Sequence, residues 1–303
     1  MNDEPLPELA LVRSTGGATF VVRALRSAEP GRPVAVILPA MGTPARFYLP
    51  LARALHGEGL SVVTVDLRGQ GESRPRAARG VRFGYREMLE DDLPAVLDAV
   101  RAELPGAPVA LVGHSLGGQF GLLHAATAKV PVDAVALVAS GSVWWRAYGV
   151  RGLGTLVFSQ LAAGLATALG HWPGRRLGFG GQQPAGVMRD WARQARTGRY
   201  APTGSPVDYE GALRDLALPV LVVGVDHDSL APVGAREHLA GKVPRAAVDR
   251  WQYTRDSAEG KAVDHFRWVR HHAGLAPYLA AWLLKAADAR GPQADGREEP
   301  PAA

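Results

Sequence analysis

The stretch Gly113-His114-Ser115-Leu116-Gly117-Gly118 decides the fold, because it places a Gly-x-Ser-x-Gly motif between two contrasting segments. Residues 109–112 are all apolar and predict a buried strand, whereas residues 120–128 are rich in Ala and Leu and predict a helix. Ser115 then lies on the tight turn between them. Gly113 and Gly117 lack the Cβ atoms that would clash where such a strand and helix approach each other. In this context the motif predicts that Ser115 is a nucleophile.

The composition limits the class of protein. The chain has 303 residues, of which 47% are hydrophobic and 21% charged, and this is typical of a globular domain that carries an insertion. No cysteine is present, which excludes disulfides, thiol catalysis and Cys-ligated metals. The net charge of +5 comes from arginines spread along the chain without a basic-aromatic module, so we expect no nucleic-acid partner. Because the first residues contain no apolar signal region, we expect a cytoplasmic protein.

The longest apolar stretch covers residues 153–169. Gly and Ser interrupt it, and it falls short of the roughly 18 uninterrupted apolar residues of a membrane span. We therefore expect no stable membrane insertion, and we interpret the stretch as a lid helix that could touch acyl chains. The oligomeric state stays open.

The order of predicted elements indicates an α/β fold with a mostly parallel central sheet. A Gly-Gly pair inside residues 9–25 predicts a hairpin. Strands are predicted at 34–38, 61–66, 109–112, 134–139, 220–225 and 247–253, and helices at 45–56, 85–103, 120–128, after 232 and at 275–287. Between 141 and 211 no run resembles a strand. The predicted organisation is a core in two parts (1–141 and 211–287), a helical lid at 142–210 and a disordered tail at 288–303.

A serine nucleophile needs a base and an acid that orients the base. In a fold of this type they follow in the order Ser, Asp, His, which Ser115, Asp228 and His265 satisfy. Asp228 follows the strand at 220–225, and the proline four residues later has the spacing that starts the next helix. Asp226, two residues earlier, is the alternative acid.

The predicted base, His265, falls in the loop between the last strand and the last helix. His271 and His272 are the alternatives, since they also precede that helix. Two backbone N–H groups are expected to hold the oxyanion: that of Leu116, at a helix N-terminus, and that of Met41, in the loop after the first parallel strand.

Together with the serine motif, several other segments resemble the α/β-hydrolase superfamily. They include Asp66-Leu67-Arg68-Gly69-Gln70-Gly71-Glu72-Ser73, LPAMGTPARFYLPLARAL, LVASGSVWW and DHFRWVR. More narrowly, the chain is similar to predicted bacterial α/β-hydrolases related to serine esterases and aminopeptidases, whose substrates are undefined. The resemblance implies the α/β-hydrolase fold, with helices on both faces of the sheet and an inserted helical lid. It departs from the superfamily at Pro39-Ala40, where His-Gly is usual, and in a longer acid loop, which keeps Asp226 open.

These residues predict a serine hydrolase that cleaves an ester, thioester or amide through an acyl-enzyme, most simply a carboxylesterase acting on a small acyl substrate. An acyltransferase, a macrocyclase or an aminopeptidase would use the same three residues. A ligand-binding relative without catalysis is the alternative of another class. No Gly-rich phosphate loop or His pair at ligand spacing occurs, so neither a cofactor nor a metal is expected.

Aromatic residues and arginines concentrate in the predicted lid. We expect the aromatic side chains to line an apolar acyl pocket, and an arginine to receive an anionic group. The aromatic candidates are Trp144, Trp145, Trp172, Trp191 and Phe179.

Overall fold

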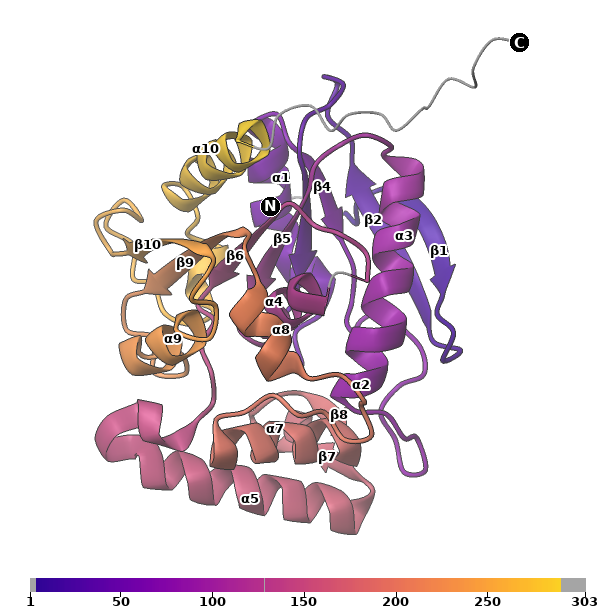
Figure 1. The fold of residues 1–303 in the computed structure, drawn as a ribbon, viewed down its shortest axis with the longest axis vertical. Coiled ribbons are helices and arrows are strands. Elements are labelled where there is room, and N and C mark those ends of the chain that lie inside the picture. Colours follow the sequence, from indigo (N-terminus) through magenta and orange to yellow (C-terminus); the bar gives the residue numbers. More distant parts are fainter. Residues whose placement is uncertain (1–3, 128, 290–303) are drawn as a thin grey trace.

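The computed structural model describes residues 4–127 and 129–289, which form an eight-stranded sheet covered by helices (Figure 1). The strand order is β1-β2-β4-β3-β5-β6-β9-β10. Strand β2 is antiparallel to both of its neighbours, β1 and β4, and the strands β4, β3, β5, β6, β9 and β10 are parallel to one another. The strands are β1 (Glu8–Arg13), β2 (Thr19–Leu25), β3 (Val34–Leu38), β4 (Ser61–Thr64), β5 (Val109–His114), β6 (Ala134–Val138), β9 (Pro219–Val225) and β10 (Ala247–Tyr253). The predicted α/β-hydrolase architecture is confirmed.

Helices pack on both faces of the sheet because its central strands are apolar on both sides. One face is covered by α1 (Leu49–Gly57) and α10 (Leu275–Asp288), whose leucines pack on Ile37 and Val112. On the other face, α3 (Leu93–Glu103), α4 (Leu116–Thr127) and α8 (Tyr209–Asp215) contribute to one hydrophobic cluster with Val36 and Leu111. The remaining core helices are the short α2 (Tyr85–Glu87) and α9 (Val233–Ala240).

Two predicted helices are less regular than expected. The helix predicted at 45–56 begins with a 3-10 turn, Ala45–Tyr48, before α1, whose second residue is Pro50. The helix predicted at 85–103 contains a π turn, Met88–Asp92, directly before Pro94 in α3. In both places a proline near the start of the α-helix cannot donate a backbone hydrogen bond to the preceding turn.

The chain leaves the sheet after β6 and returns at β9, its neighbour in the sheet. The inserted segment (residues 142–210) forms a separate layer below the sheet in Figure 1. It contains a 3-10 stretch (Trp145–Arg151), α5 (Gly152–Leu169), β7 (His171–Pro173), α6 (Gly174–Leu177), β8 (Gln182–Pro184) and α7 (Ala185–Thr197).

Two details of this region differ from the expectation. The prediction that it holds no strand was wrong, because β7 and β8 pair antiparallel over three residues each, too short for any alternating pattern to show. At its end, α8 packs against α4 of the core. Of the predicted tail at 288–303, Asp288 is the last residue of α10, and residues 290–303 lie outside the described residues.

The Asp66–Ser73 segment forms a turn held by its own side chains. The carboxylate of Asp66 accepts hydrogen bonds from the Ala45 N–H and the Glu72 N–H, each at 2.7 Å. Arg68 donates from Nε to Asp92 Oδ2 at 2.7 Å in a buried ion pair. These contacts join the segment after β4 to the 3-10 turn before α1 and to the π turn before α3.

Candidate active site

Ser115 occupies a strained turn between β5 and α4. Its φ of 53° lies in the left-handed region, which is uncommon for a residue with a side chain. The strain is compensated by hydrogen bonds at both backbone groups: the Ser115 N–H donates to the Val138 carbonyl at 3.2 Å, and the Ser115 carbonyl accepts from Ser140 Oγ at 2.6 Å. The side chain is therefore held at the end of the strand, where it is partly exposed.

The flanking glycines allow this turn because no side chain fits at their positions. A Cβ at Gly113 would lie 2.2 Å from Gly118 Cα, and a Cβ at Gly117 would lie 2.1 Å from the Leu38 carbonyl oxygen. Strand β3, which contains Leu38, pairs directly with β5. The small residues thus bring α4 against the end of β3, and with it the loop that contains Met41.

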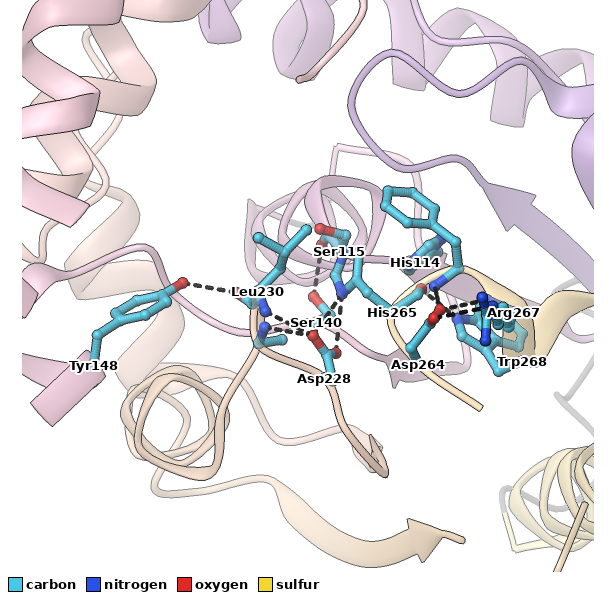
Figure 2. A network of polar contacts seen from close by, with 12 residues as sticks. His114, Ser115, Ser140, Tyr148, Asp228, Leu230, Asp264, His265, Arg267 and Trp268 are labelled. Atoms are coloured by element: carbon cyan, nitrogen blue, oxygen red, sulfur yellow. Dashed lines mark hydrogen bonds and ion pairs between the residues drawn. The ribbon is translucent and has the colours of Figure 1, made fainter. Parts of the chain in front are cut away.

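His265 and Asp228 form a hydrogen-bonded pair (Figure 2). Nδ1 of His265 lies 2.9 Å from both carboxylate oxygens of Asp228. Oδ1 of Asp228 also accepts from the N–H groups of Leu230, at 2.9 Å, and Ala231, at 2.8 Å. Because an ionised carboxylate only accepts, Nδ1 carries the proton and Nε2 is left as an acceptor. In Figure 2 the His265 ring lies between the Asp228 carboxylate and Ser115.

The alternative acid and bases have other partners. Asp226 accepts from the side chain of Gln252 at 2.9 Å and from the Arg255 N–H at 3.3 Å. The His271 carbonyl accepts from the Tyr253 hydroxyl, and His272 lies at the turn before α10, where its carbonyl accepts from backbone N–H groups. The structure therefore brings Asp228, rather than Asp226, to His265.

The two residues whose backbone N–H groups were predicted to hold the oxyanion lie at the same cavity as Ser115. Met41 and Leu116 both line the cavity that contains Ser115, and neither N–H donates to another group in the described part of the chain. The preceding residue, Ala40, is fixed because its N–H donates to the Tyr48 hydroxyl at 2.9 Å. That contact holds the loop after β3 in place.

His114, a buried histidine that the sequence analysis did not name as a site residue, lies against both Tyr48 and His265. The hydroxyl of Tyr48 lies 2.7 Å from Nδ1 of His114, and the His114 ring centroid lies 4.7 Å from that of His265. The Tyr48 hydroxyl thus bridges the Ala40 N–H and Nδ1 of His114. Burial holds the pKa of His114 well below its usual value, and the neighbouring His265 lowers this pKa further. His114 is therefore uncharged beside His265.

The cavity at Ser115 has a volume of about 290 Å³ and lies between the sheet and the inserted segment. Ser115 and His265 both line it, as do Phe179 and Trp191 from the inserted segment. Most other lining side chains are apolar, and Arg151 is the one arginine among the described lining residues, which include no Lys, Asp or Glu. The lining also includes Val143, Tyr148, Phe158, Leu230 and Phe266, which the sequence analysis did not name; the apolar repeat around Phe158 was the available signal.

The three other aromatic candidates do not line this cavity. Trp144 stacks on His238, with ring centroids 4.5 Å apart, and Trp145 lies beside the Arg146 guanidinium. Trp172 is buried, and its Nε1–H donates to the Phe179 carbonyl at 2.8 Å. Trp172 therefore supports a lining residue instead of forming part of the lining.

The fold agrees with comparisons against known proteins. The chain matches the α/β-hydrolase fold family over residues 33–253, and it therefore belongs to that family. The matched residues include Ser115 and Asp228 and end before His265.

Curated relatives match only in part. Protein phosphatase methylesterase 1 of Bos taurus is 30% identical over 129 residues, covering 42% of this chain and 32% of the relative. Monoglyceride lipase of Homo sapiens is 39% identical over 79 residues, covering 26% of this chain and 25% of the relative. The matched regions thus span about a third or less of those proteins.

Solved structures match over almost the whole chain. Proline iminopeptidase of Mycobacterium smegmatis has a TM-score of 0.61 at 15% identity, and the match covers 93% of this chain and 99% of that one. An esterase of Pyrococcus furiosus has a TM-score of 0.58 at 13% identity, covering 92% and 90%. At such identities the likeness establishes the fold.

Proposed function

We propose that this protein is a serine hydrolase that cleaves the ester of a small apolar acid through an acyl-enzyme. The observation that carries the proposal is that His265, which is hydrogen-bonded to Asp228, lines the same apolar cavity as Ser115. Membership of the α/β-hydrolase family supports hydrolysis.

The proposed reaction begins when Nε2 of His265 takes the proton of the Ser115 hydroxyl and the oxygen attacks the substrate carbonyl carbon. The N–H groups of Met41 and Leu116 hold the resulting oxyanion. The same proton then passes to the leaving alcohol, and an acyl-serine remains. Water, deprotonated by His265, attacks this ester and releases the acid. Throughout, Asp228 holds the imidazole in the required tautomer.

The cavity lining favours a neutral or anionic substrate over a cationic one. Arg151 lies in the lining, and no Asp or Glu of the described chain does. Aminopeptidase substrates carry an ammonium group, which binds best beside a carboxylate. The lining therefore favours ester hydrolysis over removal of an N-terminal amino acid.

A fluorophosphonate probe tests the proposal, because it reacts only with an activated serine. We expect the purified protein to be labelled, and the variants Ser115→Ala and His265→Ala to remain unlabelled. His271→Ala is the matched control, since it removes a nearby histidine outside the cavity lining, and it should be labelled as strongly as the unaltered protein.

The same variants should be assayed with 4-nitrophenyl butyrate. Turnover should fall by at least about 10⁴-fold in Ser115→Ala and His265→Ala, and remain within about twofold in His271→Ala. Persistent labelling of Ser115→Ala would show that another residue is the nucleophile and would refute the assignment.

A further inference from the structure

Helix α5 turns its large apolar side chains away from the protein. Leu153 is 64% exposed and Leu161 is 68% exposed. Four more large side chains of α5 are between 40% and 49% exposed: Val157, Phe158, Leu165 and Leu169. Apart from the adjacent pair Val157 and Phe158, successive members are three or four residues apart, which places them along one side of the helix. Figure 1 shows α5 as the outermost helix of the inserted segment.

The buried side of α5 carries small residues instead. Ser159, Ala162, Ala163 and Ala166 are the buried residues along its middle, where α5 packs against α7. A surface helix of a globular protein normally has the opposite distribution, with its large apolar side chains inward. A contiguous row of large exposed apolar side chains is typical of an interaction surface. We therefore expect the outer face of α5 to bind another surface.

The charges around this face indicate what covers it. Residues 152–169 contain no charged residue, whereas residues 142–207 contain eight arginines and a single acidic residue, Asp190, which is buried. Arg151 precedes α5, and Arg175 and Arg176 follow it in α6, all with exposed side chains. An apolar face with cationic groups at both ends complements a surface that is apolar inside and anionic at its rim.

We propose that the outer face of α5 docks on an anionic lipid surface, with its apolar side chains among the acyl chains and the arginines at the headgroups. Such helices lie in the plane of the interface. Residues Trp145–Leu169 are long and apolar enough to span a membrane by length and composition. However, the small-residue side of α5 packs on α7, so the helix lies along the surface and does not cross it.

One residue connects this face with the cavity. Phe158 is 42% exposed on the outer face and also lines the cavity that contains Ser115. A docked protein would therefore take an apolar ester from the lipid phase directly towards Ser115. This supply of substrate rests on the proposed function, whereas docking rests on the surface alone.

Vesicle flotation with a matched pair of variants tests the proposal. Leu161→Glu places a charge in the centre of the α5 face, and Leu11→Glu makes the same change in β1, where Leu11 is 70% exposed. We expect the protein to bind vesicles containing phosphatidylglycerol at least about tenfold more tightly than pure phosphatidylcholine vesicles, and to be released by high salt. Leu161→Glu should weaken binding by at least about tenfold, and Leu11→Glu should not.

Three results would overturn docking: no binding to anionic vesicles, equal weakening by both variants, or light scattering that shows a dimer dissociated by Leu161→Glu in the absence of vesicle binding. The last result would identify the face as a contact between copies of the chain. Hydrolysis of soluble 4-nitrophenyl butyrate keeps the two proposals separate. Leu161 does not line the cavity, so this activity should be unchanged in Leu161→Glu, and its absence from the unaltered protein would refute the proposed function alone.

Discussion

Among single residues, Asp228 has the most specific expected role. Its Oδ1 accepts two backbone N–H groups while the carboxylate faces Nδ1 of His265. In Asp228→Asn the amide oxygen would keep the backbone contacts, so the NH₂ group would face Nδ1. His265 would then carry its proton on Nε2 and could not accept the proton of Ser115.

We therefore expect Asp228→Asn to lower kcat by about 10³- to 10⁴-fold on a soluble ester with little change in KM. Asp226→Asn is the control, because Asp226 contacts Gln252 and Arg255 instead of His265. Steady-state kinetics of the two variants measure the difference. An equal loss in both variants would contradict the assignment of Asp228.

Candidate residues with a fixed chemical context can be named from the sequence, whereas residues placed by packing cannot. Ser115 and His265 follow from a motif and from chain order. The choice between Asp228 and Asp226 depended on loop geometry that spacing alone does not determine. Tyr48 and His114 have no such signal, because their roles arise from side chains that meet only after β3 and β5 pair.

Among the secondary-structure elements, α4 and α5 offer two glycines in opposite environments. A Cβ at Gly117 in α4 would meet the backbone of Leu38 at 2.1 Å, whereas a Cβ at Gly164 in α5 would meet nothing within 4 Å. We expect Gly117→Ala to lower the free energy of unfolding by about 3 kcal/mol or more. Gly164→Ala should raise it by about 0.5–1 kcal/mol, because alanine loses less backbone entropy in a helix.

Urea unfolding followed by circular dichroism measures both changes. If Gly117→Ala yields no soluble protein, Gly164→Ala can still be measured, and it tests the exposed side of α5. A lower free energy of unfolding in Gly164→Ala than in the unaltered protein would show that this side of α5 is covered in solution. Similar free energies of unfolding for both variants would contradict the close approach of α4 to β3.

The elements themselves were predicted well where an apolar run has one interpretation. The strands of the parallel sheet lie within two residues of their predicted positions, because a short run bounded by turns is typical of a buried strand. The start of α4 was predicted four residues late, since Gly117 and Gly118 have low helix propensity and the turn at Ser115 overrides it.

At the scale of the whole molecule, a buried histidine makes stability depend on pH. His124 is 0% exposed, and burial lowers its pKa from the usual 6.5 to about 4. Its Nε2 lies 2.9 Å from the Val130 carbonyl, so a proton on Nδ1 would have no partner in the described chain. The unfolded chain binds a proton below pH 6.5 while the folded protein does not, and stability is therefore lost as the pH falls from 6.5 to about 4.

His124→Gln keeps a donor for Val130 but cannot titrate. Urea unfolding at pH 7 and at pH 4.5 should show that the unaltered protein loses about 2–3 kcal/mol more than the variant over this range. Identical pH dependence of the two proteins would show that His124 titrates normally in the folded state.

The overall fold was predictable because alternating strands and helices with one motif admit few arrangements. The cavity was not predictable to the same degree. Its lining depends on how the inserted segment folds over the sheet edge, so Phe179 and Trp191 line it while Trp144, Trp145 and Trp172 pack elsewhere.

The position of the insertion between β6 and β9 also has a consequence for how the chain folds. These neighbouring strands are separated by all of residues 139–218, so their pairing closes a long loop and is entropically costly. Asp228 and His265 both follow that loop in the chain, so the proposed site, which combines them with Ser115, can form only after this non-local step. Non-local pairing of this kind slows folding. Before this pairing forms, the apolar face of α5 has already been synthesised, and it is therefore available for misassociation between nascent chains.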